Sequence, residues 1–347
     1  MAEFDEAIRK DVSAETLQWH LEYLCTLARD SGTPPERQAA DYIMEQLRRY
    51  GVDARLHEFD AYLSYPLDST LEVVAPERIT LPSRPRAFSA STPDDGIEGE
   101  VVFIGEVGPE DKGKMIFAKA GQAEEYRGRD VSGKIVLSTG GGPDGVALAQ
   151  EHGALALIHM WPSGESNIHE MIVTPVWGTP TPESAGRIPR IPTVSITRGD
   201  GERLRAMLDR GSVRLRLRAK TWIGWKRVPL PVGHIPGRHG KEFLLVGAHI
   251  DSWYYGATDN ATGDACLLEL ARVLARHQNR LRAGVRFAWW PGHSTGRYAG
   301  STWYVDNTFE ELRTYALGYL NIDSPGVRGS KIFDCRYNMG EVERFMV

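Results

Sequence analysis

The sequence predicts an α/β protein in which a mostly parallel, mixed sheet has helices on both faces and a second, β-rich domain is inserted. Apolar strands alternate with longer helical segments after residue 240, and helical spacing dominates residues 15–50. Between them, residues 66–225 contain short β-like runs separated by Gly, Pro and Asp. The α/β domain is therefore expected to comprise residues 1–65 and 226–347, interrupted by the inserted domain.

Residues 15–50 are expected to form two helices joined by a turn. Their apolar residues recur every three or four positions, which places them on one helical face. Gly32-Thr33-Pro34-Pro35 interrupts this pattern, and the prolines suit the first turn of the second helix because an N–H there has no helical partner. Gly51 is placed to end that helix, and a strand pattern follows at residues 52–56.

The predicted inserted domain consists of short strands. Its apolar runs include LEVVA, GEVVFIG, GKIVLS and ALALIHM. Near its end, Val213, Leu215 and Leu217 alternate with arginines, which predicts a half-buried strand with one cationic face exposed to solvent.

After residue 240, three apolar segments are separated by two helical ones. The apolar segments are FLLVGAH, VRFAWW and YALGYLNID, and the helices are expected at ACLLELARVLARH and near residues 298–314. Strands that are apolar on both faces are typical of a parallel sheet covered on both sides. In such sheets ligands bind at the carboxyl ends of the strands.

Composition limits the class of partner. The 347-residue chain is 41% hydrophobic and 25% charged, with a formal net charge of -5 and no basic stripe. Neither nucleic acid nor a membrane is therefore an expected partner. The charged N-terminus, MAEFDEAIRKDV, lacks the apolar run of a secretory signal, so a cytoplasmic location is expected.

Candidate metal ligands follow two of the C-terminal strands. His249 and Asp251 end the first strand, Asp259 follows in a Gly-bracketed turn, and Asp323 ends the third. A His with a nearby carboxylate can bind a metal through one ring nitrogen while the acid fixes the other. Three protein ligands with one open position make a catalytic zinc site. Each residue alone would more often be a cap, turn or core residue.

These segments resemble a known family. Residues 244–269, the block FAWWPGHSTGRYAGS and the block LNIDSPG are similar to the co-catalytic zinc aminopeptidases and glutamate carboxypeptidase II-like metallopeptidases. Residues 66–225, with GKIVL and IPTVSIT, resemble the protease-associated domain inserted in that family. The resemblance covers nearly the whole chain and implies a zinc exopeptidase-like α/β domain.

The resemblance also implies roles for individual residues. His249 and Asp323 would bind the first metal, Asp259 would bridge two metals, and Asp251 would orient His249. The family has a Glu-Glu pair where this chain has His293-Ser294, and its last histidine ligand has no counterpart here. One zinc ion is therefore expected without the second, and His293 would replace the first Glu as proton carrier.

The expected function is metal-dependent hydrolysis of peptide or amide bonds, of the aminopeptidase or carboxypeptidase type. Trp253, just after the proposed ligands, and Ser294 are weaker candidates for contact with the substrate. The end of the chain before the last strands of the family fold leads us to expect an oligomer or a partner chain that completes the sheet.

Two alternatives remain open. The altered metal site is also compatible with a non-catalytic interaction or assembly subunit on the same fold. Gly292-His293-Ser294-Thr295-Gly296 matches the nucleophile elbow of serine acyl hydrolases, which would make Ser294 the nucleophile. That motif requires a later histidine, and none follows Ser294, so we rank this alternative lowest.

Overall fold

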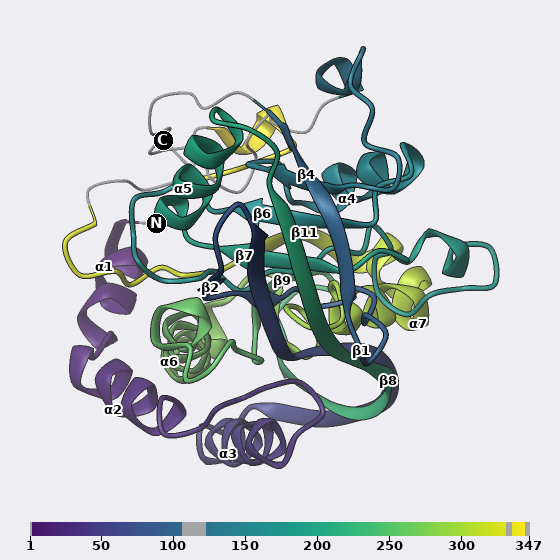
Figure 1. Cartoon of the computed structure of the whole chain (residues 1–347). Coiled ribbons are helices and arrows are strands. Elements are labelled where there is room, and N and C mark those ends of the chain that lie inside the picture. The colour runs from purple at the N-terminus through teal and green to yellow at the C-terminus, as the bar shows by residue number, and fades with distance from the viewer. Residues whose placement is uncertain (1, 106–122, 331–334, 344–347) are drawn as a thin grey trace.

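The computed structural model describes residues 2–105, 123–330 and 335–343. A continuous path of paired strands runs through these residues in the order β11-β9-β10-β8-β4-β5-β6-β7-β3, with β1 and β2 attached to β8 and β1 (Figure 1). The strands are β1 (Asp53–Ala75), β2 (Ile79–Leu81), β3 (Arg84–Pro85), β4 (Ile97–Ile104), β5 (Ile135–Ser138), β6 (Ala156–Met160), β7 (Thr193–Ile196), β8 (Arg214–Ile235), β9 (Phe243–His249), β10 (Gly284–Trp290) and β11 (Ala316–Asn321).

The helices cover both faces of this arrangement. They are α1 (Ala2–Asp11), α2 (Ala14–Leu24), α3 (Pro34–Arg49), α4 (Pro143–Glu151), α5 (Arg198–Leu208), α6 (Thr262–Arg276) and α7 (Ala299–Tyr315). Short 3-10 turns lie at Ala123–Tyr126, Ala185–Arg187, Gln278–Arg280 and Gly340–Val342. The sequence did not lead us to expect α1, whereas the two helices expected in residues 15–50 are confirmed as α2 and α3.

The sheet formed by β8, β9, β10 and β11 is sandwiched between helices. Its strands β9, β10 and β11 are parallel, and β8 joins β10 in the antiparallel sense. Helices α2, α3 and α6 pack on one face through a core that includes Leu47, Leu267 and Trp289. Helix α7 packs on the other face, where Phe243 and Tyr304 belong to a second core (Figure 1). The predicted mixed α/β sheet with helices on both faces is confirmed.

Two long strands, β1 and β8, connect this sheet to the rest of the protein. Strand β1 pairs with β8 along its length, from Asp53 opposite His234 to Ala75 opposite Arg214. The end of β8 pairs with β10, and its start pairs with β4. The domain boundaries expected at residues 66 and 225 therefore fall within paired strands rather than in loops.

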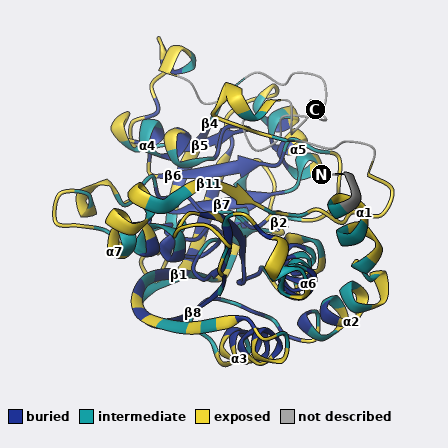
Figure 2. Ribbon diagram, turned by 180° about the vertical axis from the view of Figure 1, so that it is seen from behind, coloured by how far each residue is buried: buried dark blue, intermediate teal, exposed yellow. Residues whose placement is uncertain are grey.

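A second lobe lies at the far end of this β1–β8 ribbon. Strands β4, β5, β6 and β7 are parallel to one another, and their buried residues form two apolar cores with α4 and α5. Strands β5, β6 and β7 appear dark blue in Figure 2, because all of their residues are buried. The alternating strand predicted near residue 215 is confirmed, because Leu215 and Leu217 are buried while Arg214 and Arg216 form ion pairs with Glu98.

Strand β11 lies at one end of the strand path and pairs with β9. Its side chains Leu317 and Tyr319 are 56% and 52% exposed. This edge is where the expected partner chain would join the sheet. That expectation stays a prediction.

The buried histidine His20 in α2 predicts that the folded protein loses stability in acid. His20 is fully buried, with Nδ1 2.7 Å from the Tyr42 hydroxyl and Nε2 2.9 Å from the Tyr50 hydroxyl. Burial lowers the pKa of His20 to about 4 from its ordinary 6.5. The folded state therefore favours neutral His20, and this contribution to stability is complete above pH 6.5 and is lost as the pH falls from 6.5 through 4.

The prediction is tested with His20→Gln, which cannot titrate. Between pH 7 and 4.5, the free energy of unfolding of the unsubstituted protein should fall by on the order of 2 kcal/mol more than that of the variant. Urea denaturation at both pH values measures this difference. His239→Gln, at an exposed residue, should behave like the unsubstituted protein. Parallel pH profiles for His20→Gln and the unsubstituted protein would contradict the prediction.

Candidate metal centre

The candidate ligands meet where three parallel strands end. His249 is the last residue of β9 and lies opposite Trp290, the last residue of β10. On the other side of β9, the N–H of Ile322 donates to the carbonyl of Gly247 at 2.8 Å, which places Asp323 beside His249. Segments far apart in the sequence therefore meet at one sheet edge, as expected for a site of this architecture.

Two carboxylates face one nitrogen of His249. Nε2 lies 2.8 Å from Oδ1 of Asp259 and 3.5 Å from Oδ1 of Asp323. His249 is 2% exposed, yet within the described residues its Nε2 has no hydrogen bond of acceptable geometry. A buried imidazole nitrogen that faces two carboxylates without such a bond fits a metal ion, because all three groups offer a lone pair.

His293 lies against the same cluster. Its ring stacks on that of His249 with centroids 4.1 Å apart and an interplanar angle of 9°. One potential ligand atom from each of His249, His293 and Asp323 lies within 4.8 Å of the others. The residue that replaces the expected Glu is thus within reach of an ion held by the neighbouring ligands.

Asp251 connects His249 to the segment after β10. Its backbone carbonyl lies 2.9 Å from Nδ1 of His249, and its carboxylate Oδ1 lies 3.6 Å from the same nitrogen. The two carboxylate oxygens accept the backbone N–H groups of His293 and Ser294 at 3.0 and 2.9 Å. Asp251 therefore fixes the His293 backbone as well as the ring of His249.

The charges of the site favour a cation. Burial opposes a charge on His249, but the carboxylates of Asp251, Asp259 and Asp323 raise its pKa well above the ordinary value. Burial would likewise raise the pKa of Asp251, yet His249 and the N–H of Ser294 lower it to about 2. Burial and the positive charge on His249 lower the pKa of His293 to about 4. The neighbour of His249 is thus a neutral imidazole, a weaker base than an ordinary histidine.

Two buried residues that we had not singled out hold the loops of the site. The side chain of Asn260 donates to the carbonyl of Ile322 at 3.0 Å and accepts from the N–H of Ser324 at 3.0 Å. It follows Asp259 through a cis peptide bond in the π-helical turn Ala257–Ala261. Arg29, after α2, is completely buried and donates to backbone carbonyls of the loop between β9 and that turn.

Of the weaker candidates, Trp253 is half-buried and Ser294 is buried. Trp253 packs against an apolar cluster of Ala87, Phe88 and Ile172 from the second lobe. Ser294 is 7% exposed, and its N–H is bonded to Asp251. Contact of either residue with a substrate stays a prediction.

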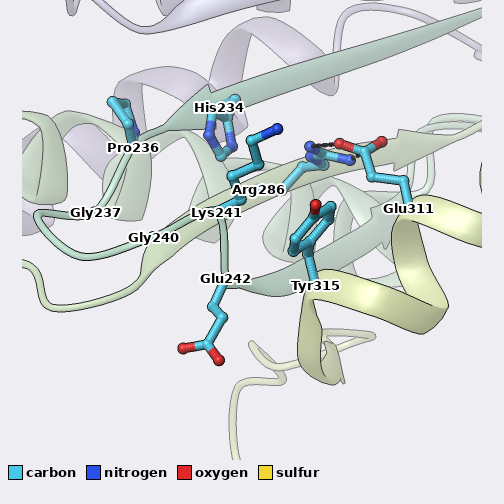
Figure 3. Close-up of a pocket in the computed structure, with 9 residues that line it drawn as sticks. All are labelled: His234, Pro236, Gly237, Gly240, Lys241, Glu242, Arg286, Glu311 and Tyr315. Carbon is cyan, nitrogen blue, oxygen red and sulfur yellow. Dashed lines mark hydrogen bonds and ion pairs between the residues drawn. The ribbon is translucent and has the colours of Figure 1, made fainter.

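A pocket elsewhere on the protein is distinct from this site. It is lined by His234, Lys241, Arg286 and Glu311, among others, near the residues where β9 and β10 begin (Figure 3). Arg286 binds Glu311 through two hydrogen bonds of 2.9 and 2.7 Å. Because the candidate ligands lie at the opposite ends of these strands, the pocket is not part of the metal centre.

The candidate ligands lie at the carboxyl edge of an α/β sheet, where proteins of this architecture bind their ligands. Known proteins resemble this chain in sequence and in fold. The sequence model of "Peptidase family M28" matches residues 232–344. A probable lipoprotein aminopeptidase of Mycobacterium tuberculosis, LpqL, is 29% identical over 334 residues, which cover 93% of this chain and 61% of that protein. The chain spans about half the length of two further curated relatives.

Solved structures share the fold. An aminopeptidase from Aneurinibacillus sp. strain AM-1 has a TM-score of 0.67 at 23% identity, covering 93% of this chain and 73% of that one. A zinc aminopeptidase from Bacillus subtilis has a TM-score of 0.63 at 20% identity, covering 90% and 68%. Residues 232–344 therefore match the M28 sequence model, and the described part of the chain shares the fold of these aminopeptidases. The predicted resemblance to the zinc metallopeptidases is confirmed at the level of this sequence match and of the fold.

The expected cytoplasmic location is wrong. The M. tuberculosis relative is named a lipoprotein, whereas the expectation rested on the charged first residues of the sequence. Because the chain matches 61% of that relative, those residues carry no information about location. None of the helices in the described part of the chain is long and apolar enough to cross a membrane.

Proposed function

We propose that this chain hydrolyses peptide or amide bonds with one zinc ion held by His249, Asp259 and Asp323. The observation that carries the proposal is the buried Nε2 of His249, which faces both carboxylates without a hydrogen bond of acceptable geometry among the described residues. When bound, zinc supplies a Lewis acid that polarises a carbonyl and lowers the pKa of water towards neutrality.

The neighbouring residues have separate roles in this proposal. Asp251 orients the ring of His249 and holds the backbone of His293. The ring of His293 receives the proton of the attacking water and returns it to the leaving amine. Its stacking contact with His249 supports this role, because it places the ring next to the proposed ligands.

One ion, rather than two, agrees with the residues present. A serine occupies the position where the resemblance implies a carboxylate ligand for a second metal. A neutral hydroxyl is a weak ligand for zinc compared with a carboxylate. We therefore infer a mononuclear site.

The second lobe, residues 66–225, is proposed to be a protease-associated domain. It contacts the metal-site loop directly, because the hydroxyl of Tyr254 donates to Oε1 of Glu170 at 2.9 Å. Arg84 forms an ion pair with the same carboxylate. These contacts support a role for the lobe in the substrate-binding surface.

Metal removal and reloading test the proposed function. The purified protein is expected to contain about one zinc per chain, to hydrolyse members of a panel of aminoacyl amides and short peptides, to lose this activity with a chelator and to regain it with zinc. Activity that persists in metal-free protein would overturn the proposal. Bound zinc without activity on any substrate would instead support the non-catalytic alternative.

His293→Ala separates a proton carrier from a ligand. If His293 moves the proton, the variant should bind zinc within about tenfold of the unsubstituted affinity and lose about 10²- to 10⁴-fold in kcat. Zinc titration against a chromogenic chelator and steady-state kinetics measure the two quantities. Loss of zinc from His293→Ala would assign the imidazole to the coordination shell instead. His239→Ala, at an exposed site, is the matched control.

A further inference from the structure

Aromatic side chains from both lobes meet beside the candidate metal centre. Trp177, in the segment between β6 and β7, contacts Tyr298 with ring centroids 5.0 Å apart and an interplanar angle of 69°. Tyr298 contacts His293 with centroids 4.8 Å apart, and His293 stacks on His249. A row of four rings therefore leads from the surface of the second lobe to the proposed ligand.

The two outer rings are held in place by backbone contacts. The N–H of Gly178 donates to the carbonyl of Arg297 at 2.6 Å. Gly178 has φ +67°, and a Cβ there would lie 2.1 Å from Oγ1 of Thr302 in α7, so glycine allows the close approach. The hydroxyl of Thr302 donates in turn to the carbonyl of Tyr298 at 2.9 Å.

The conformation of the loop before α7 is costly. Arg297 and Tyr298 have φ values of 48° and 68°, in the left-handed region that residues with a Cβ seldom occupy. Such conformations are unfavourable for residues with a Cβ and cluster at functional sites, where the surrounding structure holds them. Here the result of the strain is that Tyr298 lies between His293 and Trp177.

These rings offer a surface for an apolar group. Trp177 is 65% exposed despite its contact with Tyr298, so much of its ring surface remains accessible. Flat aromatic faces bind apolar and especially aromatic side chains well. The guanidinium of Arg297 lies 5.1 Å from the centre of the Tyr298 ring, and its positive charge opposes a lysine or arginine side chain at the same place.

We propose that Trp177 and Tyr298 form the subsite for the substrate side chain next to the cleaved bond, and that this subsite selects large, apolar, preferably aromatic side chains. The inference rests on the proposed function, because it takes the metal centre as the place of cleavage. It assigns to the second lobe, through Trp177, a direct part in substrate choice.

The experiment compares the unsubstituted protein with Trp177→Ala and with Trp225→Ala, which removes another exposed tryptophan, 57% accessible. Zinc-loaded protein is expected to prefer the p-nitroanilide of phenylalanine over that of alanine in kcat/KM. Trp177→Ala should lower this preference about tenfold, whereas Trp225→Ala should preserve it. An unchanged preference in Trp177→Ala, or a native preference for lysine or glutamate substrates, would overturn the proposal.

Binding without catalysis provides a separate readout. L-phenylalaninamide should bind zinc-loaded protein more tightly than L-alaninamide in equilibrium dialysis. Trp177→Ala should lower the ratio of the two dissociation constants about tenfold. If no substrate is hydrolysed but this difference is present and depends on Trp177, the proposed function fails while the subsite stands. If hydrolysis occurs and both amides bind alike, the subsite fails alone. Thermal melting of Trp177→Ala should match that of Trp225→Ala, because both side chains are largely exposed.

Discussion

His249→Ala is expected to abolish both zinc binding and hydrolysis while the protein remains folded. The side chain is the point at which Asp259 and Asp323 converge, and its loss leaves two carboxylates, one of which is 59% exposed. Even residues that only orient a ligand change metal affinity by about 10- to 100-fold, so loss of the ligand itself should exceed 100-fold. Elemental analysis of purified protein should fall from about one zinc per chain to none.

His239→Ala is the matched control, because it removes an exposed imidazole outside the site. It should retain the metal content and kcat/KM of the unsubstituted protein. Circular dichroism on all three proteins distinguishes loss of the ion from loss of the fold. Retention of one tightly bound zinc by folded His249→Ala would refute the proposed ligand set.

Arg29→Met is expected to lower the free energy of unfolding by about 4 kcal/mol. The completely buried guanidinium donates to five backbone carbonyls, and methionine fills a similar volume but leaves these acceptors unpaired. The acceptors are the carbonyls of Leu24, Leu27, Ile250, Tyr255 and Gly256, at 2.6 to 3.2 Å. Urea unfolding at pH 7.5 should show a lower midpoint with a similar dependence on urea concentration.

Arg203→Met tests whether this effect is particular to the buried site. Arg203 lies on the exposed side of α5, so its replacement should change the free energy of unfolding by less than about 0.5 kcal/mol. Because Arg29 holds the carbonyls on both sides of the metal-site loop, Arg29→Met should also weaken zinc binding. Equal stability of the two variants would show that the carbonyls find other partners.

The sheet and the convergence of the candidate ligands were predictable from the sequence, for a local reason. The segment before His249 is apolar on both faces, which indicates a strand buried between helices, and the apolar run before Asp323 indicates a second strand, although most of β11 is exposed. Parallel strands end at one edge, so residues that terminate them lie together whatever the intervening loops do. The helical spacing of apolar residues in α3, together with the prolines at its start and Gly51 after its end, was likewise sufficient to predict this helix.

Other features depend on contacts between distant segments and left no local signal. Arg29 stands in an ordinary polar stretch, and its burial arises because the loop after β9 folds over it. Trp177 reaches Tyr298 only because the second lobe turns back toward α7. The left-handed residues before α7 could not be foreseen either, since neither Arg297 nor Tyr298 favours that conformation.

The β1–β8 ribbon also has a consequence for the order in which the protein is made. Asp53 emerges from the ribosome early but pairs with His234, whose synthesis must wait for the whole second lobe. The cost of closing so long a loop in an unstructured chain is avoided if the lobe compacts first and brings its two ends together. Until then, the N-terminal helices cannot pack on the sheet, so their apolar faces stay exposed to solvent. Segments with exposed apolar faces are the kind that chaperones bind during translation.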